Sequence, residues 1–150
     1  MIHEQIKKEI QDALRSRDTE KLSVLRGMLS AFTNALVEKG KKPDGQLNDD
    51  EALEVIRRAV KQRQDAIDQF NRGNRKELAE KEAREQALLL TYLPPQMSEA
   101  EITAIVKEKK ESLGITDKTK MGMLIGAVMK EVANKADGTL VRKVVEAELG

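Results

Sequence analysis

Residues 88–101, LLLTYLPPQMSEAE, decide how this chain is organised. The leucines before Pro94-Pro95 belong to a helix, and that helix must end there, because proline cannot donate a backbone N–H and disfavours the α conformation of the residue before it. Ser98 followed by Glu101 is a capping box, which predicts the start of a new helix. We therefore predict a domain boundary here, with one domain at 1–95 and another at 96–150.

Upstream of the prolines, apolar residues recur at three- and four-residue spacing, the pattern of amphipathic helices. The first helix is marked by Ile2, Ile6, Ile10 and Leu14. The second helix runs from a cap at Asp18 to Gly40, and the third runs from a cap at Asn48 to Gly73. The fourth helix runs from a cap at Asn74 to the prolines. The spacing thus predicts a helical N-terminal domain of about four helices.

Downstream, a fifth helix opens at Ser98 and ends at Gly114, a sixth is capped by Thr116 or Asp117, and a seventh is capped by Asp137. No segment alternates apolar and polar residues like a strand. The predicted fold class is all-α, with a small three-helix domain following the N-terminal one.

Composition limits the function classes. The 150 residues carry 27 Lys and Arg against 26 Asp and Glu, so the whole chain has no field that would mark a nucleic-acid binder. Cysteine is absent, which excludes disulfides and thiolate chemistry. No run approaches the roughly 18 to 20 apolar residues of a membrane span. We expect a soluble, cytoplasmic protein without a membrane partner.

Few residues suggest catalysis. His3 is the only imidazole and is expected to be a solvated surface residue, since no second ligand or triad partner accompanies it. Glu82 and Glu85 share a helix face but are expected to be solvated as well. We therefore predict no catalytic residue, no cofactor and no metal site.

The densest basic patch is Arg57 to Arg63, RRAVKQR. It could contact phosphate, but it lacks interleaved aromatics and acidic residues flank it. Ion pairing with acids of the fourth helix is the interpretation we favour.

Gly122 and Gly126 lie one turn apart inside the predicted sixth helix, where each glycine costs roughly 1 kcal/mol relative to alanine. Two kinds of contact could compensate this cost in stability. Another helix could pack closely against the glycines, or they could form a flat face for an RNA backbone, supported by Lys120, Lys130 and Lys135.

Several segments together resemble a known family. They are KLSVLRGML (21–29), KQRQDAIDQFNRGNR (61–75), EQALLLTYLPPQMSEAE (85–101) and MGMLIGAVMKEVANKADGTLV (121–141). Taken in order over nearly the whole chain, they resemble the YqeY family, also called GatB/YqeY domain proteins.

The resemblance implies a C-terminal domain similar to the tail of the B subunit of the tRNA-dependent amidotransferase, a glutamine-dependent carbon–nitrogen ligase whose tail contacts tRNA. The catalytic domains of that enzyme have no counterpart in 150 residues. The resemblance therefore implies an accessory protein that is not catalytic alone and that binds tRNA or associates with an amidotransferase. The positions matching the family motif are Gly122, Gly126, Lys135, Asp137 and Gly138.

The chain departs from the family where cations are often found, at Met123, Glu131 and Ala133. Residues 98–150 hold nine basic and nine acidic residues, so we expect weak RNA binding. The alternative function is a helical module that binds a protein partner and has no RNA role.

Overall fold

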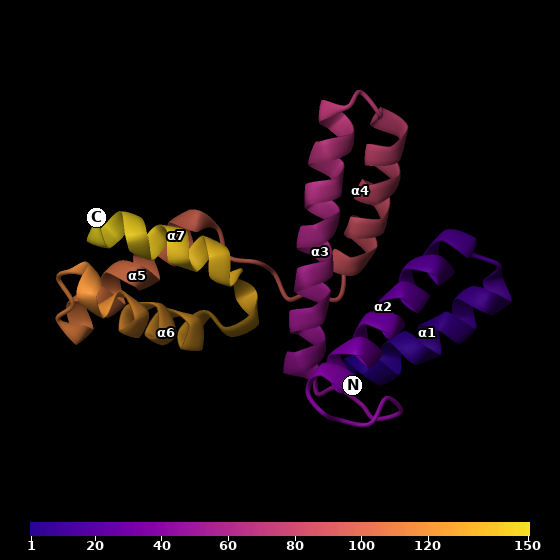
Figure 1. Cartoon of the computed structure of the whole chain (residues 1–150), viewed down its shortest axis with the longest axis horizontal. Helices are drawn as coiled ribbons and strands as arrows, with labels where there is room; N and C mark the ends of the chain where they lie inside the picture. The colour runs from indigo at the N-terminus through magenta and orange to yellow at the C-terminus, as the bar shows by residue number, and fades with distance from the viewer. The chain divides into compact units, whose positions relative to one another are not determined.

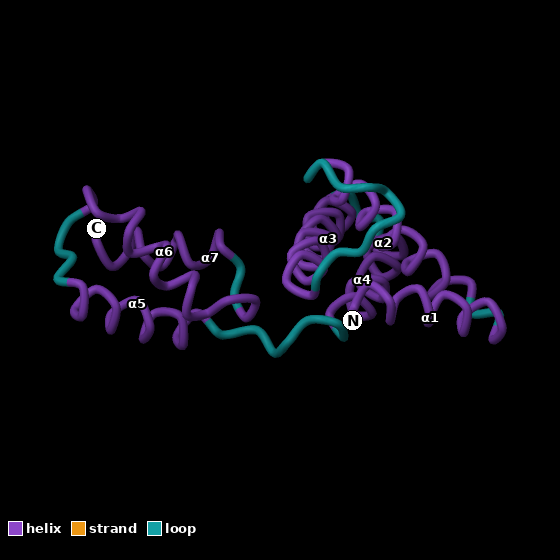
Figure 2. The backbone as a smooth tube through the Cα atoms, turned by 90° about the horizontal axis from the view of Figure 1, so that it is seen from below, coloured by secondary structure: helices purple, strands orange, loops and turns teal.

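The computed structural model describes the backbone of residues 1–150 and every side chain except that of Asn134. Its described residues form helices joined by loops, without a strand, which confirms the all-α fold (Figure 2). The helices are α1 (Ile2–Ser16), α2 (Thr19–Glu38), α3 (Asp49–Arg72), α4 (Lys76–Leu90), α5 (Glu99–Leu113), α6 (Met121–Val132) and α7 (Gly138–Leu149), with short 3₁₀ turns η1 (Lys118–Lys120) and η2 (Ala133–Lys135).

The chain divides into two compact units, Met1–Leu93 and Pro94–Gly150. The division falls at the first proline, two residues before the predicted boundary, because Pro94 already interrupts helical hydrogen bonding. Whether each unit folds on its own stays a prediction.

The N-terminal unit consists of two antiparallel helix pairs, α1 with α2 and α3 with α4 (Figure 1). Its core is formed by the apolar faces of all four helices and by one residue of the α2–α3 loop. The buried members are Ile6, Ile10, Val24, Leu25, Met28, Phe32, Leu36, Leu47, Ala52, Ile56 and Leu89. Gly40 ends α2 in the left-handed conformation at φ 72°, and the N–H of Lys41 donates to the carbonyl of Leu36 at 2.8 Å.

His3 is not a solvated residue, so that prediction is wrong. Its ring is 2% exposed and tilted against Phe32 with centroids 5.0 Å apart, and its Nδ1 accepts the N–H of Leu47 at 3.0 Å. Burial, followed by the nearby charge of Lys7, lowers the pKa of His3. The buried imidazole thus joins α1 to the loop before α3.

The predicted cap of α4 is also wrong. Asn74 adopts the left-handed conformation at φ 58° and helps to end α3, while Arg75 takes the N-cap position without a side-chain hydrogen bond. Asparagine tolerates this conformation, so it fulfils the role predicted for Gly73, which has φ −86°. Asn48 does form the predicted capping box with Glu51.

The C-terminal unit packs α5, α6 and α7 around a second core (Figure 1). Its buried residues are Ile102, Val106, Ile115, Leu124, Val128, Val132, Ala136, Val141, Val144 and Val145. Asp117 caps the turn η1, so α6 begins only at Met121. Asp137 caps α7 as predicted, accepting the N–H of Thr139 at 3.3 Å.

Across the described residues, the helices lack the combination of length and apolar content that a membrane span requires.

Candidate functional site

The glycines of α6 face open space. Both Gly122 and Gly126 are exposed, and a Cβ added to either would meet nothing within 4 Å. The packing interpretation is therefore wrong, because no described residue outside α6 lies within 4 Å of the Cβ that either glycine lacks. The buried residues of α6 are Leu124, Val128 and Val132, which point to the other side of the helix. The cost of the glycines is not compensated by packing.

The open face continues along the helix beyond the glycines. Lys130 is exposed one turn after Gly126, and Met123 beside the glycines is 60% exposed. At 1.5 Å per residue, Gly122 to Lys130 spans about 12 Å. We refer to Gly122, Met123, Gly126 and Lys130 as the α6 face. It presents a side-chain-poor surface with a cation at one end and an apolar side chain at its edge.

The turn between α6 and α7 presents a second cation. Lys135 is exposed, while its carbonyl oxygen accepts the N–H of Met97 at 2.7 Å. The next residue, Ala136, is 2% exposed, so the backbone is anchored at the lysine and directly after it. Ala133 holds φ 49° with ψ −123°, a conformation that side chains rarely adopt and that often accompanies functional turns.

Gly138 begins α7 and has no positive φ. A Cβ there would lie 3.7 Å from Cε of Met129, an ordinary contact. The turn thus depends on the Asp137 cap and on Ala136 burial, and Gly138 contributes less to its geometry than the sequence motif suggests.

Two of the three departures from the family pattern have visible consequences. Glu131 pairs with Lys109 at 3.0 Å and so offsets a cation of α5. Met123 places an apolar side chain where the family often has a charge. Both changes reduce the attraction of this unit for phosphate.

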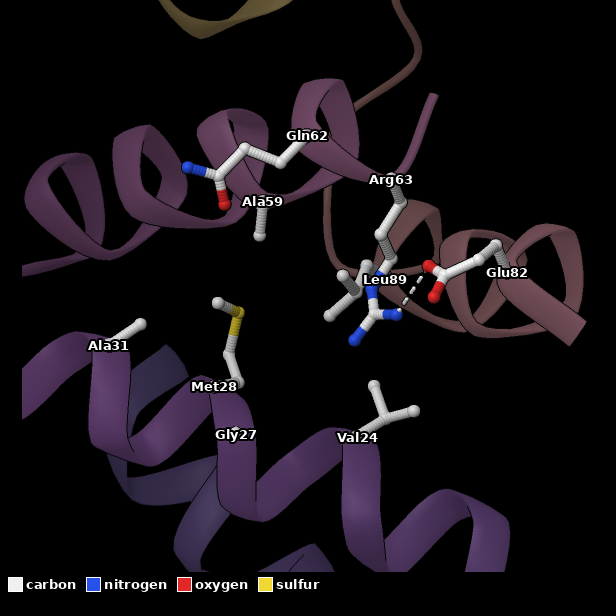
Figure 3. A pocket seen from close by; sticks show the side chains of 9 residues that line it. All are labelled: Val24, Gly27, Met28, Ala31, Ala59, Gln62, Arg63, Glu82 and Leu89. Carbon is white, nitrogen blue, oxygen red and sulfur yellow. Dashed lines mark hydrogen bonds and ion pairs between the residues drawn. The ribbon is translucent and has the colours of Figure 1, made fainter. Parts of the chain in front are cut away.

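Part of the basic patch of α3, Arg57 to Arg63, forms ion pairs inside the N-terminal unit, as Figure 3 shows for Arg63 and Glu82. Arg63 Nη1 bonds to Glu82 at 3.0 Å and to Glu85, both on α4, which confirms the favoured pairing for this residue. The expectation that Glu82 and Glu85 are solvated is wrong, since their side chains are 24% and 11% exposed. The pairing with Arg63 that the sequence favoured is what withdraws these two carboxylates from solvent.

Among the described residues, no group of three or more His, Asp or Glu side chains could hold a metal ion. The structure likewise places His3, the one imidazole, inside the core against Phe32. The α6 face and the turn after it present the exposed lysines Lys130 and Lys135 and the exposed backbone of Gly122 and Gly126.

Comparison with known proteins agrees with the sequence motifs. The family described as "Yqey-like protein" matches residues 3–149. A relative from Vanderwaltozyma polyspora, named "Altered inheritance of mitochondria protein 41, mitochondrial", is 26% identical over 144 residues, covering 92% of this chain and 70% of the relative. A relative of the same name from Pyrenophora tritici-repentis is 29% identical over 146 residues, covering 95% and 77%.

Proposed function

This chain belongs to the Yqey-like protein family, and we propose that its C-terminal unit binds the sugar–phosphate backbone of tRNA through the α6 face and the turn that follows it. The observation that carries the proposal is the open space over Gly122 and Gly126. Glycine in a helix interior is unfavourable, and at Gly126 no packing explains it. A flat surface that a nucleic-acid backbone approaches closely does explain it.

Each site residue has a distinct role in this proposal. Gly122 and Gly126 allow the RNA backbone to reach the helix surface. Lys135 contacts a phosphate, the Asp137 cap with buried Ala136 fixes the turn that presents this lysine, and Gly138 begins the helix that follows. Phosphate contacts position the RNA without reading its sequence, so discrimination between tRNAs comes from RNA shape.

The proposed protein is an accessory factor, associated with tRNA or with a tRNA amidotransferase, and we assign it no catalytic residue and no cofactor. A cytoplasmic location is part of the proposal. The mitochondrial location in the relatives' names is compatible as well, because tRNA is present in both compartments. Because the unit is neutral overall, we expect affinity near the non-specific range, a Kd of roughly 10⁻⁴ to 10⁻⁶ M.

The test is a fluorescence titration of labelled tRNA with the full chain at low and at physiological salt. Lys135→Ala should weaken binding and reduce the salt slope by about one, while leaving the melting temperature unchanged. Lys8→Ala is the matched control, because Lys8 is an exposed lysine on α1.

Unchanged affinity and slope in Lys135→Ala would remove this residue from the site. Failure of the wild-type chain to bind tRNA at low salt would contradict the proposal and favour the protein-binding alternative.

A further inference from the structure

The segment that leads into α5 is bonded directly to the turn that carries Lys135. The N–H of Met97 donates to the carbonyl oxygen of Lys135 at 2.7 Å. Met97 lies before α5 and Lys135 lies after α6, so two helices of the chain separate the partners. Because the bond joins main-chain atoms, it leaves the ammonium group of Lys135 exposed and able to contact a ligand.

The acceptor of this bond belongs to a strained turn. The 3₁₀ turn η2 begins at Ala133, whose φ of 49° and ψ of −123° lie where side chains are rarely found. Among the described contacts, two others fix the backbone beyond the lysine, the burial of Ala136 and the Asp137 cap. The Met97 bond is the one that acts on Lys135 itself.

The donor is held by stiff chain on both of its sides. Upstream, Pro94 and Pro95 have a fixed φ, and the side chain of Gln96 donates to the carbonyl of Pro94 at 2.8 Å. Downstream, Ser98 caps α5. The side chain of Met97 packs against the core of the C-terminal unit. The N–H of Met97 is therefore held in one place by contacts that do not involve Lys135.

A fixed main chain favours a phosphate contact by the lysine that it carries. A turn that is mobile in the free protein loses conformational entropy when its lysine binds, and this loss reduces the affinity. The Met97 bond orders the main chain of Lys135 before any ligand arrives. Only the side chain of the lysine then remains to be ordered by the phosphate.

We propose that Met97 is a positioning residue of the RNA site, whose N–H holds the turn after α6 in the conformation that brings Lys135 to a phosphate. This inference rests on the proposed function, because it needs RNA at Lys135. The role belongs to the backbone N–H, so every residue except proline can fulfil it. By thermodynamic linkage, RNA bound at Lys135 should in turn stabilise the Met97 bond.

Hydrogen exchange of the Met97 amide, measured by NMR on the full chain, tests the bond without altering it. We expect slow exchange in the free protein, because the amide is bonded within a fixed segment. Excess tRNA at low salt should slow this exchange further in the wild type. It should leave the exchange of the same amide unchanged in Lys135→Ala.

Two substitutions test the role in binding by fluorescence titration of tRNA. Met97→Pro removes the donor, whereas Met97→Leu keeps the N–H and a side chain of similar volume. We expect Met97→Pro to lose about two- to tenfold in affinity, the range expected for one hydrogen bond, and Met97→Leu to bind like wild type.

Double variants separate positioning from a general loss of stability. The loss caused by Met97→Pro should disappear when Lys135→Ala is also present, because no lysine remains to be positioned. It should persist when Lys130→Ala is present instead, since Lys130 is an exposed lysine on α6 before the turn. A general loss of stability would weaken binding equally in both backgrounds.

Circular dichroism establishes whether Met97→Pro folds, and if it does not, the exchange measurement decides alone. Fast exchange of the Met97 amide, or exchange unchanged by tRNA that binds, would overturn the proposal. Wild-type affinity in folded Met97→Pro, or an equal loss with and without Lys135, would overturn it as well. These results concern Met97 alone, whereas failure of the wild type to bind tRNA would overturn the proposed function and this role with it.

Discussion

Replacing Gly126 by alanine should stabilise the protein, and this outcome follows directly from the open α6 face. Gly126 is in the middle of the 12-residue helix α6, its φ is not positive, and a Cβ there meets nothing within 4 Å. Alanine therefore removes the helix penalty of glycine, about 1 kcal/mol, without a clash. Gly122 lies in the first turn, so Gly122→Ala should stabilise by less.

For a unit of about 60 residues, 1 kcal/mol corresponds to a rise in melting temperature of roughly 8 °C if the C-terminal unit melts separately. Circular dichroism of wild type, Gly126→Ala and the control Gly27→Ala measures it. Gly27→Ala should give a gain of similar free energy, since Gly27 also faces open space. A lower melting temperature for Gly126→Ala would show that another part of the molecule packs on the α6 face, and the reasoning would be refuted.

Three further predictions concern other parts of the chain. Acidification should weaken the N-terminal unit in two pH windows. Because the pKa of His3 is lowered in the folded state, stability that is present above its unfolded pKa of about 6.5 is lost as the pH falls below that value. The pKa of Glu51 is lowered to about 2, chiefly by Lys39 and then by the Asn48 N–H, so a second loss of stability follows as the pH falls below about 4.5. Urea unfolding measured from pH 8 downwards checks this. The variant His3→Leu should lower the free energy of unfolding by about 1 to 3 kcal/mol at pH 8 and should lack the first pH window. A first window that persists in His3→Leu would contradict the prediction. A fragment of residues 94–150 should melt cooperatively as a helical domain, and an unstructured circular-dichroism spectrum would show that the unit depends on the rest of the chain. Purified protein supplied with glutamine, ATP, magnesium and Glu-tRNA(Gln) should form no Gln-tRNA, whereas turnover that survives repurification and is abolished by a substitution in this chain would make it an enzyme.

The helices could be predicted because the local spacing of apolar residues marks each of them and a local cap marks several. Asn48, Ser98 and Asp137 cap the helices that their positions predict, since an N-cap bond joins residues two or three apart. Contacts between helices are not local, and that is where prediction failed. His3 meets Leu47 and Phe32 far along the chain, which its position near the N-terminus did not indicate. The pairing of Arg63 with acids of α4 was predicted, but the burial of Glu82 and Glu85 that accompanies it was not.

In the candidate site too, local sequence patterns do not predict which helices lie against one another. Spacing places Gly122 and Gly126 on one helix face, but only the structure shows which neighbours that face has. The sequence analysis does not single out Gly27, although this interior glycine of α2 is the same signal as Gly126 in α6. A helical glycine therefore indicates either close packing or an open surface, and the fold decides between them.

The most direct test of the central claim is the affinity of tRNA at low salt for Gly126→Leu compared with Gly27→Leu. Both leucines enter open space on exposed helix faces, so both variants should fold like wild type. If the α6 face binds the RNA backbone, Gly126→Leu should lose about tenfold or more in affinity while Gly27→Leu binds like wild type. Equal affinity of the two variants for tRNA would contradict the account.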